Sequence, residues 1–132
     1  MKPIPESHAD IFEKRAFAHL STLMSDGSPQ ASAVWVDTDG SLIIVNSAEG
    51  RLKDRNIRRD PRVAISVIDP DNPYRSLMIR GRVTKISNEG ADAHIDKLAK
   101  KYMGVDSYPF RTPEEVRVMY YIEPERVAKM GE

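Results

Sequence analysis

The chain has 132 residues, of which 40% are hydrophobic and 30% charged, which is enough for one core and one domain over residues 1–132. Twenty basic residues balance twenty acidic ones, and this balance argues against binding to nucleic acid or to an anionic membrane surface. The absence of cysteine excludes disulfide bonds and thiolate metal sites. With no signal peptide and no apolar run near the ~20 residues of a membrane span, we expect a soluble cytoplasmic protein.

The first third of the chain is predicted to be mostly strand. Turn residues separate the apolar runs, at Ser25 to Pro29 and at Asp39-Gly40. The predicted elements are a short helix at residues 9–14 and strands at residues 16–24, 30–37 and 41–46. Because short turns join these three strands, we expect an antiparallel meander.

In the middle of the chain, the predicted structure changes from strand to helix and back to strand. A helix is predicted over residues 48–59, with Ser47 as its N-cap, and Pro61 ends it. Two strands follow at residues 62–68 and 76–87, on either side of a polar loop at residues 69–73. Gly81 inside the second of these strands predicts a bulge or a bend of the kind found at barrel corners.

The clearest helix signal lies at residues 89–103. Ile95, Leu98, Ala99 and Tyr102 have the spacing of one buried helix face, and Gly104 is typical of a helix end. A last strand is predicted at residues 116–122. These elements show no alternation of strand and helix, so we expect a mainly β (α+β) fold, a small barrel of about six antiparallel strands with flanking helices.

A basic segment is the strongest candidate for chemistry. Two of its features favour an anion site: it has only two apolar residues to pack, and its positive charge begins at a helix N-terminus, where backbone N–H groups already attract anions. The ordinary alternative is a solvated helix face, and the pattern alone leaves it open. The basic residues are Arg51, Lys53, Arg55, Arg58, Arg59 and Arg62, against Asp54 and Asp60.

Other candidates for chemistry are weaker. The three histidines lack metal-ligand spacing, so no metal site is predicted, and the sequence has no dinucleotide, P-loop or nucleophile-elbow motif. Trp35 fits the core or a dimer interface better than a stacking platform. Tyr74 and Arg75, after Asn72-Pro73, are compatible with recognition or with an ordinary turn.

Residues 48–63, which read AEGRLKDRNIRRDPRV, resemble the hallmark segment of the pyridoxamine 5'-phosphate oxidase-like superfamily. Within it, the chain is most similar to the coenzyme F420-dependent branch, the flavin/deazaflavin oxidoreductases of the B type. The segments that support this likeness in the expected order are residues 26–30, 72–75, 80–83 and 100–102.

The resemblance implies a split β-barrel of the FMN-binding type, forming a homodimer with two cofactor sites at the subunit interface. It implies that one group of residues holds the cofactor phosphate and tail, a second lines the ring, and a third arrives from the partner subunit. These groups are Arg51, Lys53, Asn56 and, toward a polyglutamate tail, Arg55; Ser32, Ala33, Val34, Val45, Asn46 and Ser47; and Tyr74 with Arg75.

The reaction that the resemblance implies is hydride transfer between coenzyme F420 and an unsaturated small organic molecule. The cofactor supplies that chemistry while the protein supplies orientation, and no side chain stands out as a catalytic acid or base. Two alternatives share the same basic segment. One is an FMN-dependent enzyme of the pyridoxamine-phosphate-oxidase type, and the other is a protein that binds a flavin-like, F420 or haem-derived ligand without turnover.

Overall fold

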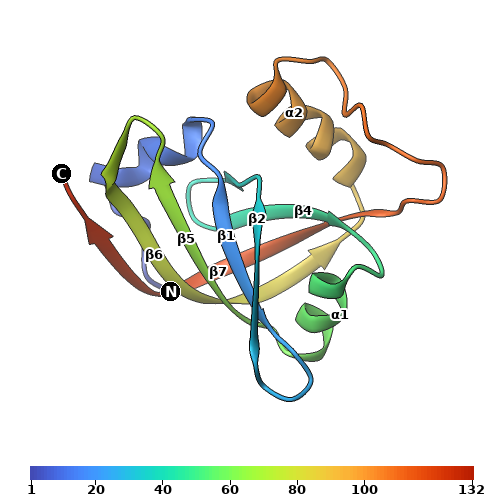
Figure 1. Cartoon of the computed structure of the whole chain (residues 1–132), viewed down its shortest axis with the longest axis horizontal. Helices are drawn as coiled ribbons and strands as arrows, with labels where there is room; N and C mark the ends of the chain where they lie inside the picture. The colour runs from blue at the N-terminus through green and yellow to red at the C-terminus, as the bar shows by residue number, and fades with distance from the viewer.

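The computed structural model describes all residues from Met1 to Glu132, and its sheet curls into a half-barrel (Figure 1). All strand pairs are antiparallel, in the order β2-β1-β5-β6-β7-β4-β3. The elements are η1 (Glu6–Glu13), β1 (Ala18–Leu23), β2 (Pro29–Val34), β3 (Asp37–Thr38), β4 (Ile43–Ala48), α1 (Leu52–Arg59), β5 (Arg62–Asp69), β6 (Asn72–Ser87), α2 (Ala91–Met103) and β7 (Arg117–Met130).

The core fills the concave side of the sheet because apolar residues alternate along the strands. In β5, Val63, Ile65 and Val67 are buried, whereas Ala64 and Ser66 between them are only partly covered. The same cluster includes residues from both ends of the chain, so a single core holds the half-barrel together. The predicted mainly β split barrel with flanking helices is therefore confirmed.

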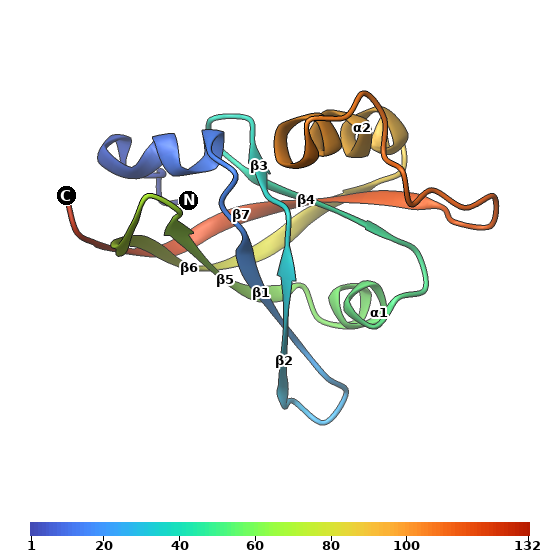
Figure 2. The ribbon, with the colours of Figure 1, turned by 45° about the horizontal axis from the view of Figure 1, so that its top comes forward.

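The predicted meander of the first three strands is wrong. β2 pairs with β1 at one edge of the sheet, whereas β3 pairs with β4 at the other edge. The run predicted as one strand at residues 30–37 therefore changes partner between Val34 and Asp37, and Figure 2 shows it passing from β2 into β3. The strand count rises to seven because this run is divided.

The bulge predicted at Gly81 is confirmed. The pairing of β6 with β7 shifts between Arg80 and Gly81, where Gly81 lies opposite Pro124. A Cβ atom at position 81 would lie 2.4 Å from the backbone oxygen of Glu123, so only glycine fits this close approach. β7 passes this point and runs on to Met130, well beyond its predicted end at residue 122.

The helices differ from prediction mainly at their starts. η1 is a 3-10 helix, and α1 begins at Leu52 with Arg51 as its N-cap; the predicted N-cap, Ser47, lies inside β4, so that prediction is wrong. α2 is confirmed, ending at Gly104 with φ +71. Neither α-helix has the length and apolar character that a membrane crossing needs. β4 passes between α1 and α2 in both views (Figures 1 and 2).

Candidate functional site

A cavity of about 220 Å³ lies where β2, β4, β7, α1 and α2 come together, and we call it the basic cavity. Its residues come from seven separate parts of the chain, so it exists only in the folded protein. The lining residues are Phe17, Ala33, Val34, Trp35, Asn46, Arg51, Lys53, Ile95, Tyr108, Phe110 and Arg117.

Aromatic side chains form one wall of the basic cavity. Trp35 stacks on Tyr102 with ring centroids 5.1 Å apart and an interplanar angle of 4°. Tyr108 meets Trp35 edge-on at 6.1 Å, and Phe110 meets Tyr108 at 5.7 Å. Such a wall offers flat apolar surface with little side-chain entropy to lose, which suits a planar ligand.

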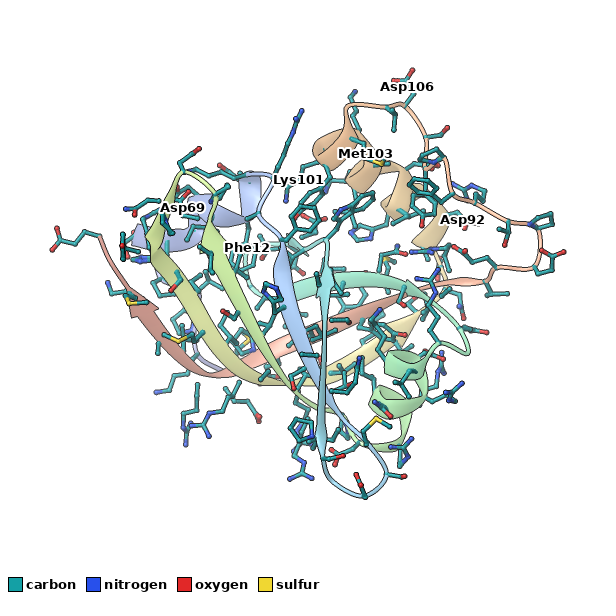
Figure 3. The ribbon with its side chains drawn as sticks, in the orientation of Figure 1. Phe12, Asp69, Asp92, Lys101, Met103 and Asp106 are labelled. Atoms are coloured by element: carbon teal, nitrogen blue, oxygen red, sulfur yellow. The ribbon has the colours of Figure 1, made fainter.

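Hydrogen bonds from the end of α2 hold the backbone behind this wall. Lys101 donates to the carbonyl oxygens of Phe12 (2.5 Å) and Val36 (3.0 Å), and Figure 3 shows Lys101 beside Phe12. Tyr102 donates to the carbonyl oxygen of Ala16 at 2.6 Å. Burial lowers the pKa of the Lys101 ammonium and raises the pKa of the Tyr102 hydroxyl. These bonds fix the platform on which Trp35 stacks.

Three cations face one carboxylate at the rim of the basic cavity. Arg51 lies 3.6 Å from Glu115, and Arg117 donates to the same carboxylate. Lys53 is half-buried and forms no ion pair; burial lowers the pKa of its ammonium, and the charges of Arg51 and Arg117 lower it further. A concave site with uncompensated positive charge attracts anions. Two residues of the basic segment and Arg117 of β7 thus bring three positive charges together at the cavity.

Five of the residues singled out from the sequence line the cavity: Ala33, Val34, Asn46, Arg51 and Lys53. Ser32, Val45 and Ser47 lie deeper, and Val45 is fully buried in the core. The Ser32 hydroxyl is buried without a hydrogen-bond partner in the chain, whereas the Ser47 hydroxyl lies near the Tyr120 hydroxyl in the core. Buried polar groups are normally satisfied, so the Ser32 hydroxyl is a feature that a polar ligand could explain.

Asn56 belongs to the framework behind the cavity. It is fully buried, donates to the Thr22 hydroxyl at 3.1 Å and accepts from Arg59 at 3.2 Å, which ties α1 to β1. Arg55 is exposed on the outer side of α1, where it donates to the Gly50 carbonyl oxygen at 2.8 Å. Asn56 therefore positions α1, and Arg55 can reach only a ligand that extends outside the cavity.

A second buried polar residue explains how α1 is held with so little apolar surface. Asp54 accepts from the Tyr120 hydroxyl at 2.7 Å, from the Gly50 N–H at 3.0 Å and from Arg58 at 3.0 Å. These bonds and the charge of Arg58 outweigh the cost of burial and lower the pKa of the Asp54 carboxyl. Burial and the neighbouring Asp54 carboxylate raise the pKa of Tyr120 far above its usual range.

Tyr74 and Arg75 lie in β6, at the other end of the sheet from α2. Arg75 donates to Asp69 at 2.8 Å and to Asp10 at 2.5 Å, and Figure 3 shows Asp69 at that far end. Arg75 is thus paired within its own chain, whereas the Tyr74 side chain is 77% exposed. No group of three or more His, Asp and Glu side chains lies close enough together to hold a metal ion.

Several lining residues were not expected at the site from the sequence: Phe17, Ile95, Tyr108, Phe110 and Arg117. One signal was available for Arg117, since it is a lone charge at the start of the apolar run VRVMYYI. It is buried, with its Nε donating to Asn46 Oδ1 at 2.9 Å and its guanidinium 5.1 Å from the Tyr108 ring. The aromatic residues come from a loop, for which periodicity gives no signal.

The curled sheet with this cavity defines a cofactor-binding split barrel. The profile of the pyridoxamine 5'-phosphate oxidase family matches residues 4–131, so the chain belongs to that family. It is similar to the solved structure of an F420 reductase, with 36% identity and a TM-score of 0.82 over 95% of this chain and 98% of that one. The family and this neighbour support a flavin-type oxidoreductase with a flavin or deazaflavin cofactor.

Two further structures share the fold. A conserved hypothetical protein from Mycobacterium tuberculosis has 25% identity and a TM-score of 0.73, over 96% of this chain and 84% of that one. HupZ of group A Streptococcus has 20% identity and a TM-score of 0.67, over 96% and 93% of the two chains. At such low identity the second likeness concerns the fold alone.

Proposed function

We propose that this protein is a coenzyme F420-dependent reductase, which transfers a hydride between the deazaflavin and an unsaturated organic substrate. The observation that carries the proposal is the basic cavity, where Arg51, Lys53 and Arg117 face a single carboxylate beside an aromatic wall. A planar ring with an anionic tail is the kind of ligand that such a site accommodates. The 36% identity to an F420 reductase supports F420 as that ligand.

The basic residues would bind the anionic part of the cofactor. Arg51 and Arg117 offer planar guanidinium groups that can make paired hydrogen bonds to a phosphate, and Lys53 adds a compact charge. Lys53 has no anionic partner in the chain, so a bound phosphate would supply the missing one. Arg55, which points away from the cavity, could contact an acidic tail that leaves it.

The strands would hold the ring. Ala33 and Val34 line the cavity from β2, and the small side chain of Ala33 lets a flat ring lie close to the strand. The residues present fit such a cofactor, because the buried hydroxyl of Ser32, next to Ala33, lacks a partner and could hydrogen-bond to a ring heteroatom. When bound, the cofactor supplies the hydride chemistry. The chain's own residues orient the ring and exclude water, and none is assigned as a proton donor.

We also propose that the protein works as a homodimer. The basic cavity is smaller than the roughly 300 to 1,000 Å³ usual for cofactor sites, so one chain supplies only part of a site. A groove of about 650 Å³ lined by Ala31, Ala64, Met78 and Ala128 runs along the outer face of the sheet. Ala31 lines the groove and Ala33 lines the cavity, and both are exposed on the same face of β2, so the two hollows are neighbours along this strand. A second copy seated in the groove would therefore enclose the cofactor.

Analytical ultracentrifugation tests the dimer. We expect about twice the chain mass of 14.9 kDa for the wild-type protein. Ala31→Glu, which places a charge in the groove, should give monomers that bind cofactor weakly. The control is Ala93→Glu, at an exposed alanine of α2 outside the groove. A wild-type protein that sediments as a monomer at every concentration would exclude the proposed interface.

The alternative is an FMN-dependent enzyme, and the match to the pyridoxamine 5'-phosphate oxidase family favours it. Both cofactors present a phosphate and a flat tricyclic ring, so the same cations and the same aromatic wall could hold either. A preference for one cofactor over the other must therefore come from contacts to the ring, which a partner subunit helps to form.

Separate fluorescence titrations with F420 and FMN decide between them. We expect F420 to bind and FMN to bind much more weakly. Tight binding of FMN with none of F420 would replace the proposal by the FMN-dependent alternative, and binding of neither would reject the cofactor site altogether. If F420 binds but its reduced form is never oxidised by a panel of unsaturated carbonyl compounds and quinones, the protein is a ligand carrier.

A further inference from the structure

We propose that His94 is a positioning residue of the basic cavity, and that its protonation weakens anion binding. In its neutral form His94 holds Arg117 in place through Asn46, and proton uptake breaks that connection. The inference rests on the proposed function, because it concerns how the same cavity keeps its cations in place for an anionic ligand.

A chain of hydrogen bonds leads from β3 to the cavity through side chains of four different elements. Asp37 of β3 is bound to His94 of α2, with Oδ2 and Nε2 3.0 Å apart. His94 Nδ1 lies 3.1 Å from the amide nitrogen of Asn46 on β4. The Asn46 oxygen accepts from Nε of Arg117 on β7 at 2.9 Å. The His94, Asp37 and Arg117 side chains are only 10%, 14% and 3% exposed, so water competes little for these bonds.

Two neighbours fix the orientation of the Asn46 amide. Its nitrogen donates to the Ala91 carbonyl oxygen at 2.9 Å, and its oxygen accepts from Arg117. Turning the amide by half a rotation would set oxygen against oxygen at Ala91 and donor against donor at Arg117. The second amide hydrogen must therefore point at His94 Nδ1, which has to act as an acceptor.

It follows that His94 is neutral and carries its proton on Nε2, which donates to Asp37. An ionised Asp37 is the partner this tautomer needs. Burial opposes ionisation of Asp37, but hydrogen bonds from His94, Thr38 and Lys97 outweigh it, so the pKa of that carboxyl lies well below its usual range. An imidazole with one nitrogen fixed as donor and the other as acceptor has its tautomer set by its neighbours.

Protonation of His94 adds a hydrogen at Nδ1, facing the NH₂ group of Asn46. Two donors cannot share that position, so the Asn46 amide must turn or move, and either change removes the acceptor of Arg117 Nε. Three charges surround His94: Asp37 of β3 favours the imidazolium, while Lys97 of α2 and Arg117 of β7 oppose it.

The consequence reaches the anion site through Arg117. Without Asn46, the remaining hydrogen-bond partner of its guanidinium is Glu115, at the rim of the cavity. Arg117 then leaves its fixed position against Tyr108 and presents a less ordered charge to the ligand. Acid should therefore weaken cofactor binding beyond the effect of any protonation of the cofactor itself.

Two variants of His94 separate its two nitrogen atoms. His94→Asn places an amide oxygen near the Nδ1 position, which keeps an acceptor for Asn46 but cannot titrate. His94→Gln reaches the Nε2 position, which keeps a donor for Asp37 but loses that acceptor. From about pH 8 to about pH 5.5, we expect wild-type F420 affinity to fall about tenfold more than that of His94→Asn. His94→Gln should bind weakly throughout. Equal pH profiles for wild type and His94→Asn would overturn the inference.

Nitrogen-15 NMR of the ligand-free protein gives a readout that needs no cofactor. At about pH 8 we expect an unprotonated Nδ1 in His94 and a slowly exchanging Nε–H in Arg117. That Nε–H should lose protection as His94 takes up a proton, and keep it in His94→Asn. The inference would be refuted if His94 carried its proton on Nδ1 at high pH, or if the exchange rate of the Arg117 Nε–H did not depend on the protonation of His94. If these signals behave as expected but neither F420 nor FMN binds, the proposed function fails while the positioning role of His94 stands.

Discussion

Two charged clusters at opposite ends of the half-barrel differ in how their charges are balanced. The far cluster, formed by Lys14, Arg75, Asp10, Asp69 and Asp71, is densely paired, with contacts of 2.9 Å for Lys14–Asp69, 3.0 Å for Lys14–Asp71 and 2.8 Å for Arg75–Asp69. The basic cavity instead has three cations around Glu115, and one of them, Lys53, is unpaired.

The paired charges of the far cluster stabilise the fold, whereas the excess positive charge of the basic cavity is available to a ligand. In the far cluster, η1 is bound to the β5–β6 hairpin, since Asp10 belongs to η1 and Asp69 and Arg75 to the two strands. In the cavity, repulsion among like charges persists because the single carboxylate of Glu115 faces three cations, and Lys53 forms no ion pair. Binding sites commonly retain such unfavourable interactions at some expense of stability.

The largest expected effect follows from Arg75→Met. This change leaves the buried Asp69 carboxylate and Asp10 without their shared guanidinium, so the melting temperature should fall by more than for any exposed arginine. Cofactor affinity should not change, because the far cluster does not touch the cavity. Thermal unfolding and F420 titration of wild type, Arg75→Met and the control Arg82→Met, at an exposed residue of β6 outside the groove, check both points. Reduced affinity in a folded Arg75→Met protein would show that the clusters are coupled.

Acid should narrow the stability difference between Arg75→Met and wild type. The hydrogen bond to Arg75 lowers the pKa of Asp10 below its ordinary 3.8, and hydrogen bonding from Lys14 holds the pKa of Asp69 well below its usual range. As the pH falls below that ordinary value, the unfolded chain binds protons that the folded chain refuses, so wild-type stability declines. Without Arg75 these pKa values rise and less stability is lost. Melting temperatures measured from about pH 7 to about pH 3 test this; parallel curves would contradict it.

The next largest expected effect is a change in cofactor affinity. Lys53→Met should weaken F420 binding by about 1.5 to 3 kcal/mol, roughly 10- to 150-fold, because it removes a charge-assisted hydrogen bond. Stability should stay the same or rise, since a half-buried, unpaired ammonium is lost. Fluorescence titration and thermal unfolding are the measurements, with the exposed Lys100→Met of α2 as the matched control. Unchanged affinity would mean that the basic segment is a solvated helix face.

The smallest expected effect comes from Glu115→Gln. The Glu115 carboxylate competes with a ligand for Arg51 and Arg117, and the neutral amide competes less. We expect F420 affinity to rise about two- to fivefold, the scale of a partly exposed ion pair. The exposed neighbour Glu114→Gln serves as the control in the same titration. If binding instead weakens, Glu115 holds the two arginines in place for the ligand.

Local patterns predicted the elements but not their partners. The nearly continuous apolar run at residues 62–68 and the spacing of Ile95, Leu98 and Ala99 gave a correct strand and a correct helix. The meander failed because pairing in this sheet joins distant segments, as in Ile43 with Ile122. Nothing in the run around Trp35 indicates that the chain changes there from one edge of the sheet to the other.

The site was predictable where its residues are consecutive and not where they are assembled. Arg51 and Lys53 could be found because they lie within one basic segment. Arg117 and Tyr108 join them only through the fold. Asn56 was expected at the ligand from the family resemblance, whereas α1 buries Asn56 and leaves its arginines exposed.

The position of β7 has a consequence for the order in which the protein acquires its binding site. β7 is the last strand along the chain, yet it lies between β6 and β4 and carries Arg117. The β1–β2 and β5–β6 hairpins can form locally and quickly, but β4 can join the sheet only after β7, across a long stretch of sequence. In a refolding experiment, anion binding should therefore return later than the spectroscopic signal of β-structure, because binding requires that β7 has docked.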